Sequence, residues 1–470
     1  MSEMPQLLEL LENAGLVDGS RINERQVMRL SAGRLSDLGA EAAAITKAED
    51  FERESGYLAH SATLSLGGGS QVCVNVECRI RRVDQLAQFA AFYSDRVFIH
   101  NFISNHEHEP HSNYVPSLEE RRHTLLDDLQ VIVRIRPLIE TGLIIPVTPT
   151  SEVCTGCIAL GAFGTDADKR FARERRRLAR RFFEEMSVDL AYNDGWWELH
   201  CEAPEELIEH GSAVTSYVEP PGPLRGMPRI LQRALGGEFV RLSRDTRRKL
   251  GEHEDAASLV FGSVVFEMAV SQALGTSYLS DTKLPIEVLS AISGDADLVR
   301  RNSLVQKHLT SFVPFLGEVP AASALKLRRR EEGSFLTYRQ ALNKAIDDVR
   351  SQRSDFSERD ARSIYSDVIA PELARLDRAV KSARREILKD VGRSIAGWSA
   401  AIGFGMYAGL LPEQLLLAAK ALGLTKVLAD IGAAIGKLAS PEDVVRKENL
   451  FFLWKVRQLS ERRRHSLSGS

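Results

Sequence analysis

The stretch that decides the fold reads VFIHNFISNHEHEPH (residues 97–111), SLEERRHTLLDDLQVIVRIRP (117–137), LIIPV (143–147) and CTGC (154–157). Short apolar runs bounded by turn residues predict strands over 97–103 and 143–147. Between them, Ser117 and Glu120 form a capping-box pattern, and apolar residues keep helical spacing until Pro137, which we expect to end the helix. The stretch therefore predicts a strand–helix–strand unit.

Two groups of metal-binding residue types follow the two predicted strands. In a right-handed βαβ unit the strands are parallel, so the loops that leave their carboxyl ends emerge at the same edge of the sheet. Two cysteines and two histidines at such spacing form a common zinc ligand set. We therefore expect a zinc site formed from His108, His111, Cys154 and Cys157, with His106 and His100 as spare ligands.

The ligand count favours a structural zinc ion, because four protein ligands close the coordination shell. A catalytic zinc ion would keep one position open to water, and Glu107 or Glu109 would then serve as the base. Two alternatives remain open. The histidine loop can be merely solvated and the CxxC a packing turn, or the CxxC can be a thioredoxin-like redox pair. Residues 158–164 are glycine-punctuated and make a poor helix start, which disfavours the redox pair.

Composition sets the class of the protein. A chain of 470 residues with 44% apolar and 27% charged residues is typical of a globular protein with several domains. The net charge of −3 excludes a global attraction to nucleic acid or anionic membrane, so any such binding must be local. Five cysteines and a start without a basic and then apolar leader predict a cytoplasmic location.

The predicted fold class is an α+β or α/β N-terminal domain with a mixed sheet, followed by a mainly α-helical C-terminal region. A hairpin is expected over 63–76 around the glycines at 67–69, and a second over 188–201 around Asn193-Asp194-Gly195. A helix is expected near 83–93, and a strand near 214–218 completes the mixed sheet. The EPPGP segment at 219–223 is a plausible domain boundary. The predicted domains are a helical cap (1–55), the mixed α/β domain with the zinc site (56–225), a helical connecting region (226–330), and a helical domain with a long antiparallel hairpin and an apolar segment (331–470).

A helix predicted near 168–186 is crowded with basic residues. Such a surface can hold phosphate groups of a nucleotide or a nucleic acid, and the candidate residues are Arg173, Arg176, Arg177 and Arg180. The alternative is a solvated face whose arginines pair with Glu174, Glu184 and Glu185. The sequence favours this second interpretation.

A long apolar segment occupies residues 394–438, of which 394–411 are uncharged. It is short for a membrane-spanning helix and rich in glycine, which favours a buried helical core over insertion into a membrane.

No GxSxG, HExxH or dinucleotide motif fixes a reaction, so whether the protein is an enzyme is left open. The favoured function is an intracellular interaction or sensor protein with a zinc-stabilised α/β domain, whose partner is another protein or a second copy of the chain. The alternatives are a metal-dependent phosphodiesterase or nuclease that acts at the sheet edge, with nucleic acid bound by the basic helix at 169–181, and a membrane-perturbing effector that acts through 394–438.

Overall fold

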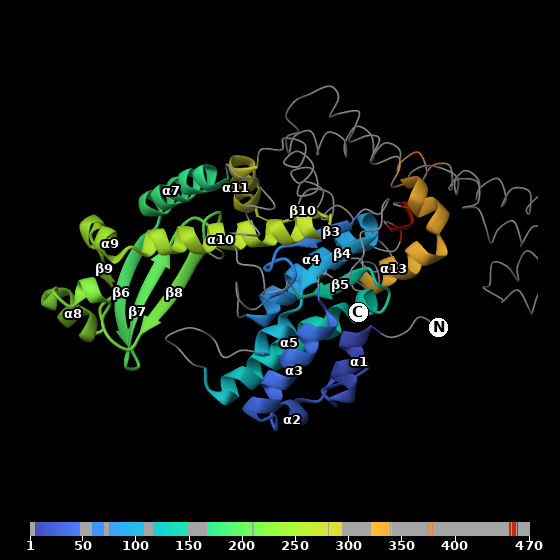
Figure 1. The fold of residues 1–470 in the computed structure, drawn as a ribbon, viewed down its shortest axis with the longest axis horizontal. Coiled ribbons are helices and arrows are strands. Elements are labelled where there is room, and N and C mark those ends of the chain that lie inside the picture. Colours follow the sequence, from blue (N-terminus) through green and yellow to red (C-terminus); the bar gives the residue numbers. More distant parts are fainter. Residues whose placement is uncertain are drawn as a thin grey trace, which may run out of the picture. The chain divides into compact units, whose positions relative to one another are not determined.

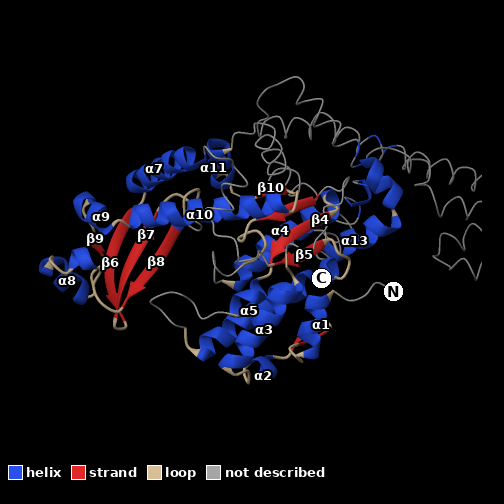
Figure 2. Ribbon diagram, viewed as in Figure 1, coloured by secondary structure: helices blue, strands red, loops and turns tan. Residues whose placement is uncertain are grey.

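The structure, a computed structural model (Figure 1), describes residues 5–47, 59–69, 75–107, 116–148, 167–208, 211–280, 282–293 and 321–338, with residues 340, 375, 378, 451, 452, 454–456 and 458. The chain forms two compact units, Met1–Val313 and Pro314–Ser470. The first unit contains one parallel and one antiparallel four-stranded sheet with helices, and the described elements of the second are helical (Figure 2). The predicted fold class is thereby confirmed.

The parallel sheet has the spatial order β10-β3-β4-β5. Its strands are β3 (Ala59–Ala62), β4 (Arg96–His100), β5 (Ile144–Val147) and β10 (Ser277–Leu279). Val97 pairs with Ile144 and His100 pairs with Val147 in parallel register, so the predicted strand–helix–strand unit is confirmed. Parallel neighbours need long crossover connections. Helix α4 (Val76–Tyr93) connects β3 to β4, and helix α5 (Leu118–Ile139) lies between β4 and β5.

Helix α5 begins as its sequence predicts. The Ser117 hydroxyl accepts a hydrogen bond from the Glu120 backbone N–H, and the Glu120 carboxylate accepts one from the Ser117 N–H. The helix then buries a stripe with helical spacing that includes Leu125, Leu129 and Ile132. The prediction that Pro137 ends the helix is wrong by two residues, because the last turn continues to Ile139 with Pro137 inside it.

The N-terminal residues form small helices that pack beside the parallel sheet. They comprise α1 (Gln6–Asn13), α2 (Glu24–Val27), α3 (Ala32–Ile45) and a minimal hairpin of β1 (Val17–Asp18) and β2 (Arg21–Ile22). Helix α3 lies against the 3-10 helix η2 (Phe102–His106), which follows β4. The contact requires Gly39, because a Cβ atom there would lie 2.1 Å from the backbone nitrogen of Glu107.

The antiparallel sheet has the order β8-β7-β6-β9. Its strands are β6 (Ser187–Asn193), β7 (Trp196–Glu202), β8 (Ser212–Tyr217) and β9 (Val240–Arg241). The predicted hairpin at 188–201 is confirmed, since Asp194 and Gly195 take φ values of 48° and 89° in a two-residue turn. Positive φ at both positions matches the twist of the flanking strands, and the Asp-Gly pair tolerates it.

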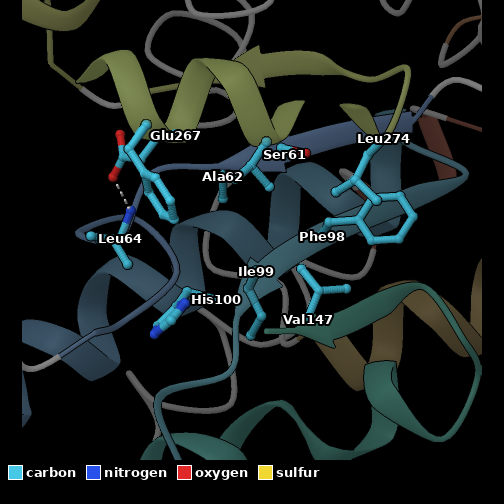
Figure 3. Close-up of a pocket in the computed structure, with 11 residues that line it drawn as sticks. Ser61, Ala62, Leu64, Phe98, Ile99, His100, Val147, Glu267 and Leu274 are labelled. Carbon is cyan, nitrogen blue, oxygen red and sulfur yellow. Dashed lines mark hydrogen bonds between the residues drawn. The ribbon is translucent and has the colours of Figure 1, made fainter. Parts of the chain in front are cut away.

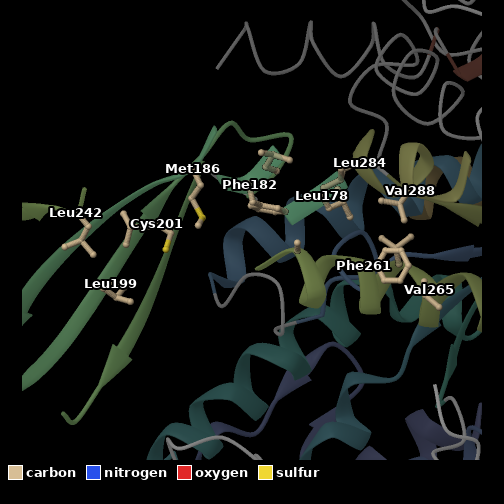
Figure 4. Packing of buried hydrophobic residues seen from close by; sticks show 14 of the residues in the cluster. Leu178, Phe182, Met186, Leu199, Cys201, Leu242, Phe261, Val265, Leu284 and Val288 are labelled. Carbon is tan, nitrogen blue, oxygen red and sulfur yellow. The ribbon is translucent and has the colours of Figure 1, made fainter. Parts of the chain in front are cut away.

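Helices cover one face of this second sheet. They are α7 (Ala167–Glu185), α8 (Pro228–Leu235), α9 (Arg244–Leu250), α10 (Glu252–Ala273) and α11 (Leu284–Ile292), with the 3-10 turn η4 (Gly222–Leu224). Leu178 and Phe182 of α7 are buried in one core cluster with Leu199 of β7 and Phe261 of α10 (Figure 4). Helix α10 also contacts β3 and β10, so it borders both sheets.

Helix α10 is the one helix among the described residues that is long and apolar enough to cross a membrane. Its Val264, Val265 and Met268 are buried in the core cluster, as expected of an internal helix. The predicted apolar segment at 394–438 lies outside the described residues.

The sequence prediction fails around the glycines at 67–69. Residues 63–69 form a turn-rich loop after β3 instead of a hairpin, and Val76 begins helix α4 instead of ending a strand. The Asn75 side chain accepts hydrogen bonds from the N–H groups of Glu77 and Cys78 and so starts the helix early. No sequence pattern predicted β10, which pairs with β3 in the parallel sheet. The hydroxyl groups of Ser61 and Thr276, which are hydrogen-bonded beside this pairing, lie 215 residues apart along the chain.

In the second unit, helix α13 (Ala321–Arg330) continues as a helix over 332–338. Phe335 and Tyr338 are buried, and both rings contact Phe452. The rest of the predicted antiparallel helical hairpin lies outside the described residues, except for isolated positions.

Candidate functional site

The order of the parallel sheet creates a crevice at its carboxyl edge. From β3 the chain moves through α4 to β4 on one side, whereas β10, reached much later through α10, pairs with the other side of β3. Where successive connections leave in opposite directions, the loops at the carboxyl ends separate, and α/β proteins bind ligands there. The loop after β3, residues 63–69, lies at this point and contains three successive glycines.

A pocket lies at this edge between α10 and one face of the sheet (Figure 3). Its cavity volume is about 40 Å³, and the pocket is partly open to solvent. Most of the lining is apolar, and the polar groups are few, as in many small-molecule sites. The described residues that line it are Ser61, Ala62, Leu64, Phe98, Ile99, His100, Val147, Phe266, Glu267, Val270 and Leu274.

Glu267 of α10 fixes the loop that follows β3. One carboxylate oxygen accepts a hydrogen bond of 2.8 Å from the Leu64 backbone N–H, and the other accepts one of 2.6 Å from the Tyr278 hydroxyl. Figure 3 shows the first of these bonds at the side of the pocket. The carboxylate therefore ties α10, β10 and the loop together, and both of its oxygens are already engaged.

His100, the last residue of β4, presents an unsatisfied acceptor. Its Nε2 lies 2.9 Å from the Asn105 side-chain oxygen, so Nε2 carries the proton and Nδ1 carries the lone pair. The buried Nδ1 has no hydrogen-bond partner, and neither does the side-chain nitrogen of Asn105. Burial lowers the pKa of His100 more than the Asn105 hydrogen bond and the Asp128 charge raise it, which keeps the ring neutral. A buried acceptor without a partner is costly, and a ligand with an N–H or O–H group would satisfy it.

A buried charge network supports the glycine loop from the other side. The Arg79 guanidinium of α4 donates to the Gly68 carbonyl at 2.7 Å and forms an ion pair with Asp128 of α5. The second Asp128 oxygen lies 2.8 Å from His106 Nε2, and Arg121 donates to the His106 carbonyl at 3.2 Å. The network thus connects the loop after β3 to the loop after β4.

Sequence reasoning missed this network, although part of it was visible in the pattern. Arg79 lies four and seven residues before the buried Val83 and Leu86, and Asp128 lies beside Leu125 and Leu129 in the apolar stripe of α5. A charged residue on each of two apolar helix faces indicates a buried pair. Nothing in the sequence indicates that the two helices meet at these residues.

The zinc ligands predicted from the sequence are described only in part. His106 is 6% exposed and bonded to Asp128, whereas His108, His111, Cys154 and Cys157 lie outside the described residues. The strands that precede the two clusters are parallel neighbours, so the histidine loop and the CxxC segment leave adjacent strand ends. Within the described part of the chain, no group of three or more histidine, cysteine, aspartate or glutamate side chains is arranged to hold a metal ion.

The structure divides the arginines of the predicted phosphate site. Arg173, Arg176, Arg177 and Arg180 are all exposed on α7, but Arg177 forms a bidentate pair with the buried Glu174 at 2.6–2.9 Å. The other three belong to no ion pair among the described residues. The predicted pairing of the helix with acidic neighbours is thus true of Arg177 and of Arg181, which contacts Glu185, Glu206 and Glu287.

No protein-family model, curated protein or solved structure matches the chain. The functional proposal therefore rests on the geometry of the site.

Proposed function

We propose that the protein is an intracellular sensor whose α/β unit binds a small ligand in the pocket at the carboxyl edge of the parallel sheet. The observation that carries the proposal is the unpartnered Nδ1 of His100 in this crevice. The apolar lining and this free acceptor define the ligand class, which is a small, mostly apolar molecule with one N–H or O–H donor. Among the described residues that line the pocket, none is a nucleophile with an adjacent base, so binding is better supported than catalysis.

Helix α10 connects the pocket to the core of the antiparallel sheet. Glu267, whose carboxylate bonds to the loop after β3, belongs to α10. Helix α10 also packs on α7 in the core cluster of the antiparallel sheet. A ligand that displaces Leu64 or the Glu267 carboxylate alters the one helix that both sheets share. This arrangement suits a sensor, because α10 contributes both to the pocket and to the core beside the antiparallel sheet.

Zinc belongs to the proposal as a structural element. One ring nitrogen of His106 is held by the Asp128 carboxylate, and histidine ligands of metals commonly have such a partner. Four of the candidate ligands His106, His108, His111, Cys154 and Cys157 would then bind the zinc ion and cross-link the two loops beside the pocket. Purified protein should contain stoichiometric zinc that the Cys154→Ser/Cys157→Ser variant loses, whereas the matched Cys78→Ser/Cys201→Ser variant keeps it.

The phosphodiesterase alternative has less support. It needs carboxylates that are free to bind metal near the histidine loop. The buried carboxylate nearest to His106 is that of Asp128, and both of its oxygens are already bonded, to Arg79 and to His106.

Histidine-specific ¹⁵N NMR tests the ligand site directly. Indole and phenol are suitable probes, because each has an apolar body and a single donor. We expect either probe to shift the Nδ1 resonance of His100, and Val270→Phe, which fills the pocket wall, to abolish the shift. If neither probe moves the His100 resonance in the wild type, the proposed ligand site is excluded. An equal shift in Val270→Phe would place the binding elsewhere.

A further inference from the structure

Exposed cations are gathered on helices α7 and α9 of the first unit. Four residues of α7 at positions i, i+4, i+7 and i+11 lie on the helix face opposite the buried Leu178. Three exposed cations of the neighbouring helix α9 extend this face. We name it the α7–α9 ridge, and its members are Lys169, Arg173, Arg176, Arg180, Arg244, Arg248 and Lys249.

Phe183 joins the two parts of the ridge. It lies three residues beyond Arg180 on the same helix face, and the guanidinium groups of Arg244, Arg247 and Arg248 lie 5.0–5.4 Å from the centre of its ring. Arg247 also donates to the carbonyls of Phe183 and Met186 at the end of α7. Cations at a helix C-terminus complement its dipole. These contacts hold α9 against the C-terminal end of α7, so the cations of the two helices are neighbours.

The positive charge of the ridge is not neutralised within the described part of the chain. No ion pair there includes any of its seven members, although exposed carboxylates of Glu184 and Asp245 border it. Arg177 and Arg181, by contrast, lie on the flank of α7 and are paired with glutamates. Burial lowers the pKa of Arg247, and the nearby charges of Arg244 and Arg241 lower it further. Cations are therefore crowded here in a protein whose net charge is −3.

We infer that the α7–α9 ridge binds the phosphate backbone of a nucleic acid. The four cations of α7 recur about every turn and rise about 16 Å along the helix, so they can follow a row of phosphates. Contacts to phosphates position a protein on nucleic acid but carry no base information directly, so we infer binding that does not depend on base sequence.

The composition of the ridge favours nucleic acid over an anionic membrane. Helices that bind membrane surfaces insert large apolar side chains beside their basic residues. Along the exposed face of α7 the apolar neighbours are Ala172 and Ala179, and Phe183 is half-buried under three guanidinium groups. No large apolar side chain on this face is available to enter a bilayer. This site is separate from the ligand pocket, and either can fail without the other.

Fluorescence anisotropy with the full chain and a labelled duplex of about 30 base pairs tests the inference, with DNA and RNA duplexes as separate arms. The variant Arg173→Gln/Arg176→Gln/Arg180→Gln removes three ridge cations. Its control is Arg225→Gln/Arg229→Gln/Arg233→Gln, which removes three exposed arginines from the η4–α8 segment of the same unit. Thermal unfolding verifies that both variants fold.

We expect the ridge variant to bind at least about tenfold more weakly, and the slope of log K against log salt to fall by about 2–3, at about 0.9 per lost phosphate contact. The control variant should stay within about twofold of the wild type. The inference is overturned if the wild type binds neither duplex at about 50 mM salt, or if both variants lose the same affinity. It is also overturned if the ridge variant loses binding to phosphatidylserine vesicles while duplex binding is unchanged.

Discussion

Arg79 and Asp128 form an ion pair in which each side chain is only 1% exposed. The two residues lie 49 positions apart, on helices α4 and α5. Each also has a second task, since Arg79 holds the Gly68 carbonyl and Asp128 holds His106. Such a pair is retained only where both charges are fully bonded, because an uncompensated charge in the interior is very unfavourable.

Replacement of Asp128 by Asn should therefore leave Arg79 charged and without its partner. We expect Asp128→Asn to lower the free energy of unfolding by about 3–5 kcal/mol, measured by urea denaturation. The exposed pair between Arg134 and Asp84 is a matched control, since it also joins α5 to α4. Arg134→Gln should cost no more than about 1 kcal/mol. Equal losses in the two variants would show that burial of the Arg79–Asp128 pair has no special role.

Gly39 offers a second test, because it lets α3 approach η2 closely. A Cβ atom at Gly39 would lie 2.1 Å from the Glu107 nitrogen and 2.6 Å from the His106 carbonyl carbon, so the helix must move away. We expect Gly39→Ala to lower the free energy of unfolding by about 1–3 kcal/mol. Gly33→Ala on the same helix meets no atom within 4 Å and should raise it by about 0.5–1 kcal/mol. If both variants gain stability, α3 and η2 do not touch as described.

Local signals in the sequence predicted the elements that local physics determines. The capping box of Ser117 and Glu120 marks the start of α5. Asn193-Asp194-Gly195 marks a hairpin, because its two-residue turn requires positive φ values that Asp194 and Gly195 tolerate. The error at 63–76 has a local cause as well, since alternating Val72, Val74 and Val76 suggest a strand, whereas Asn75 caps a helix.

The site depends on contacts that no local signal contains. The hydrogen bond from Leu64 to Glu267 joins residues 203 positions apart and exists only because β10 pairs with β3. The pattern VFIH predicted a strand that ends at the histidine loop. It did not predict that His100 would line a pocket together with residues of α10. Topology thus placed His100 and His106 at the correct sheet edge, and tertiary packing decided what surrounds them.

The neutral ring of His100 predicts a stability that depends on pH. Its pKa is lowered in the folded protein, chiefly by burial, from the ordinary value of 6.5. The unfolded chain therefore binds the proton more readily, and the contribution of His100 to stability is complete above pH 6.5 and declines as the pH falls toward the folded pKa. We expect the free energy of unfolding of His100→Gln to depend less on pH over this range than that of the wild type. The difference between the two slopes should be at most about 1.4 kcal/mol per pH unit. His253, whose pKa burial also lowers, is unchanged in both proteins, so the difference between them isolates His100. Parallel pH curves would show that His100 titrates normally in the folded state.

Arg176 and Arg177 are neighbours on α7 but differ in their partners. The side chain of Glu174 is 4% exposed and bonded to Arg177, so Arg177→Gln leaves a buried carboxylate without its cation. We expect a loss of about 1–2 kcal/mol in the free energy of unfolding, because Arg177 itself is half exposed and solvent weakens the pair. Arg176 lies on the ridge and has no ion pair among the described residues. Arg176→Gln should therefore change the free energy of unfolding by less than about 0.5 kcal/mol. Duplex binding should show the reverse order, with Arg176→Gln weakened and Arg177→Gln close to the wild type. If Arg177→Gln also weakened binding to the same degree, the division of α7 into a paired flank and a free ridge would be wrong.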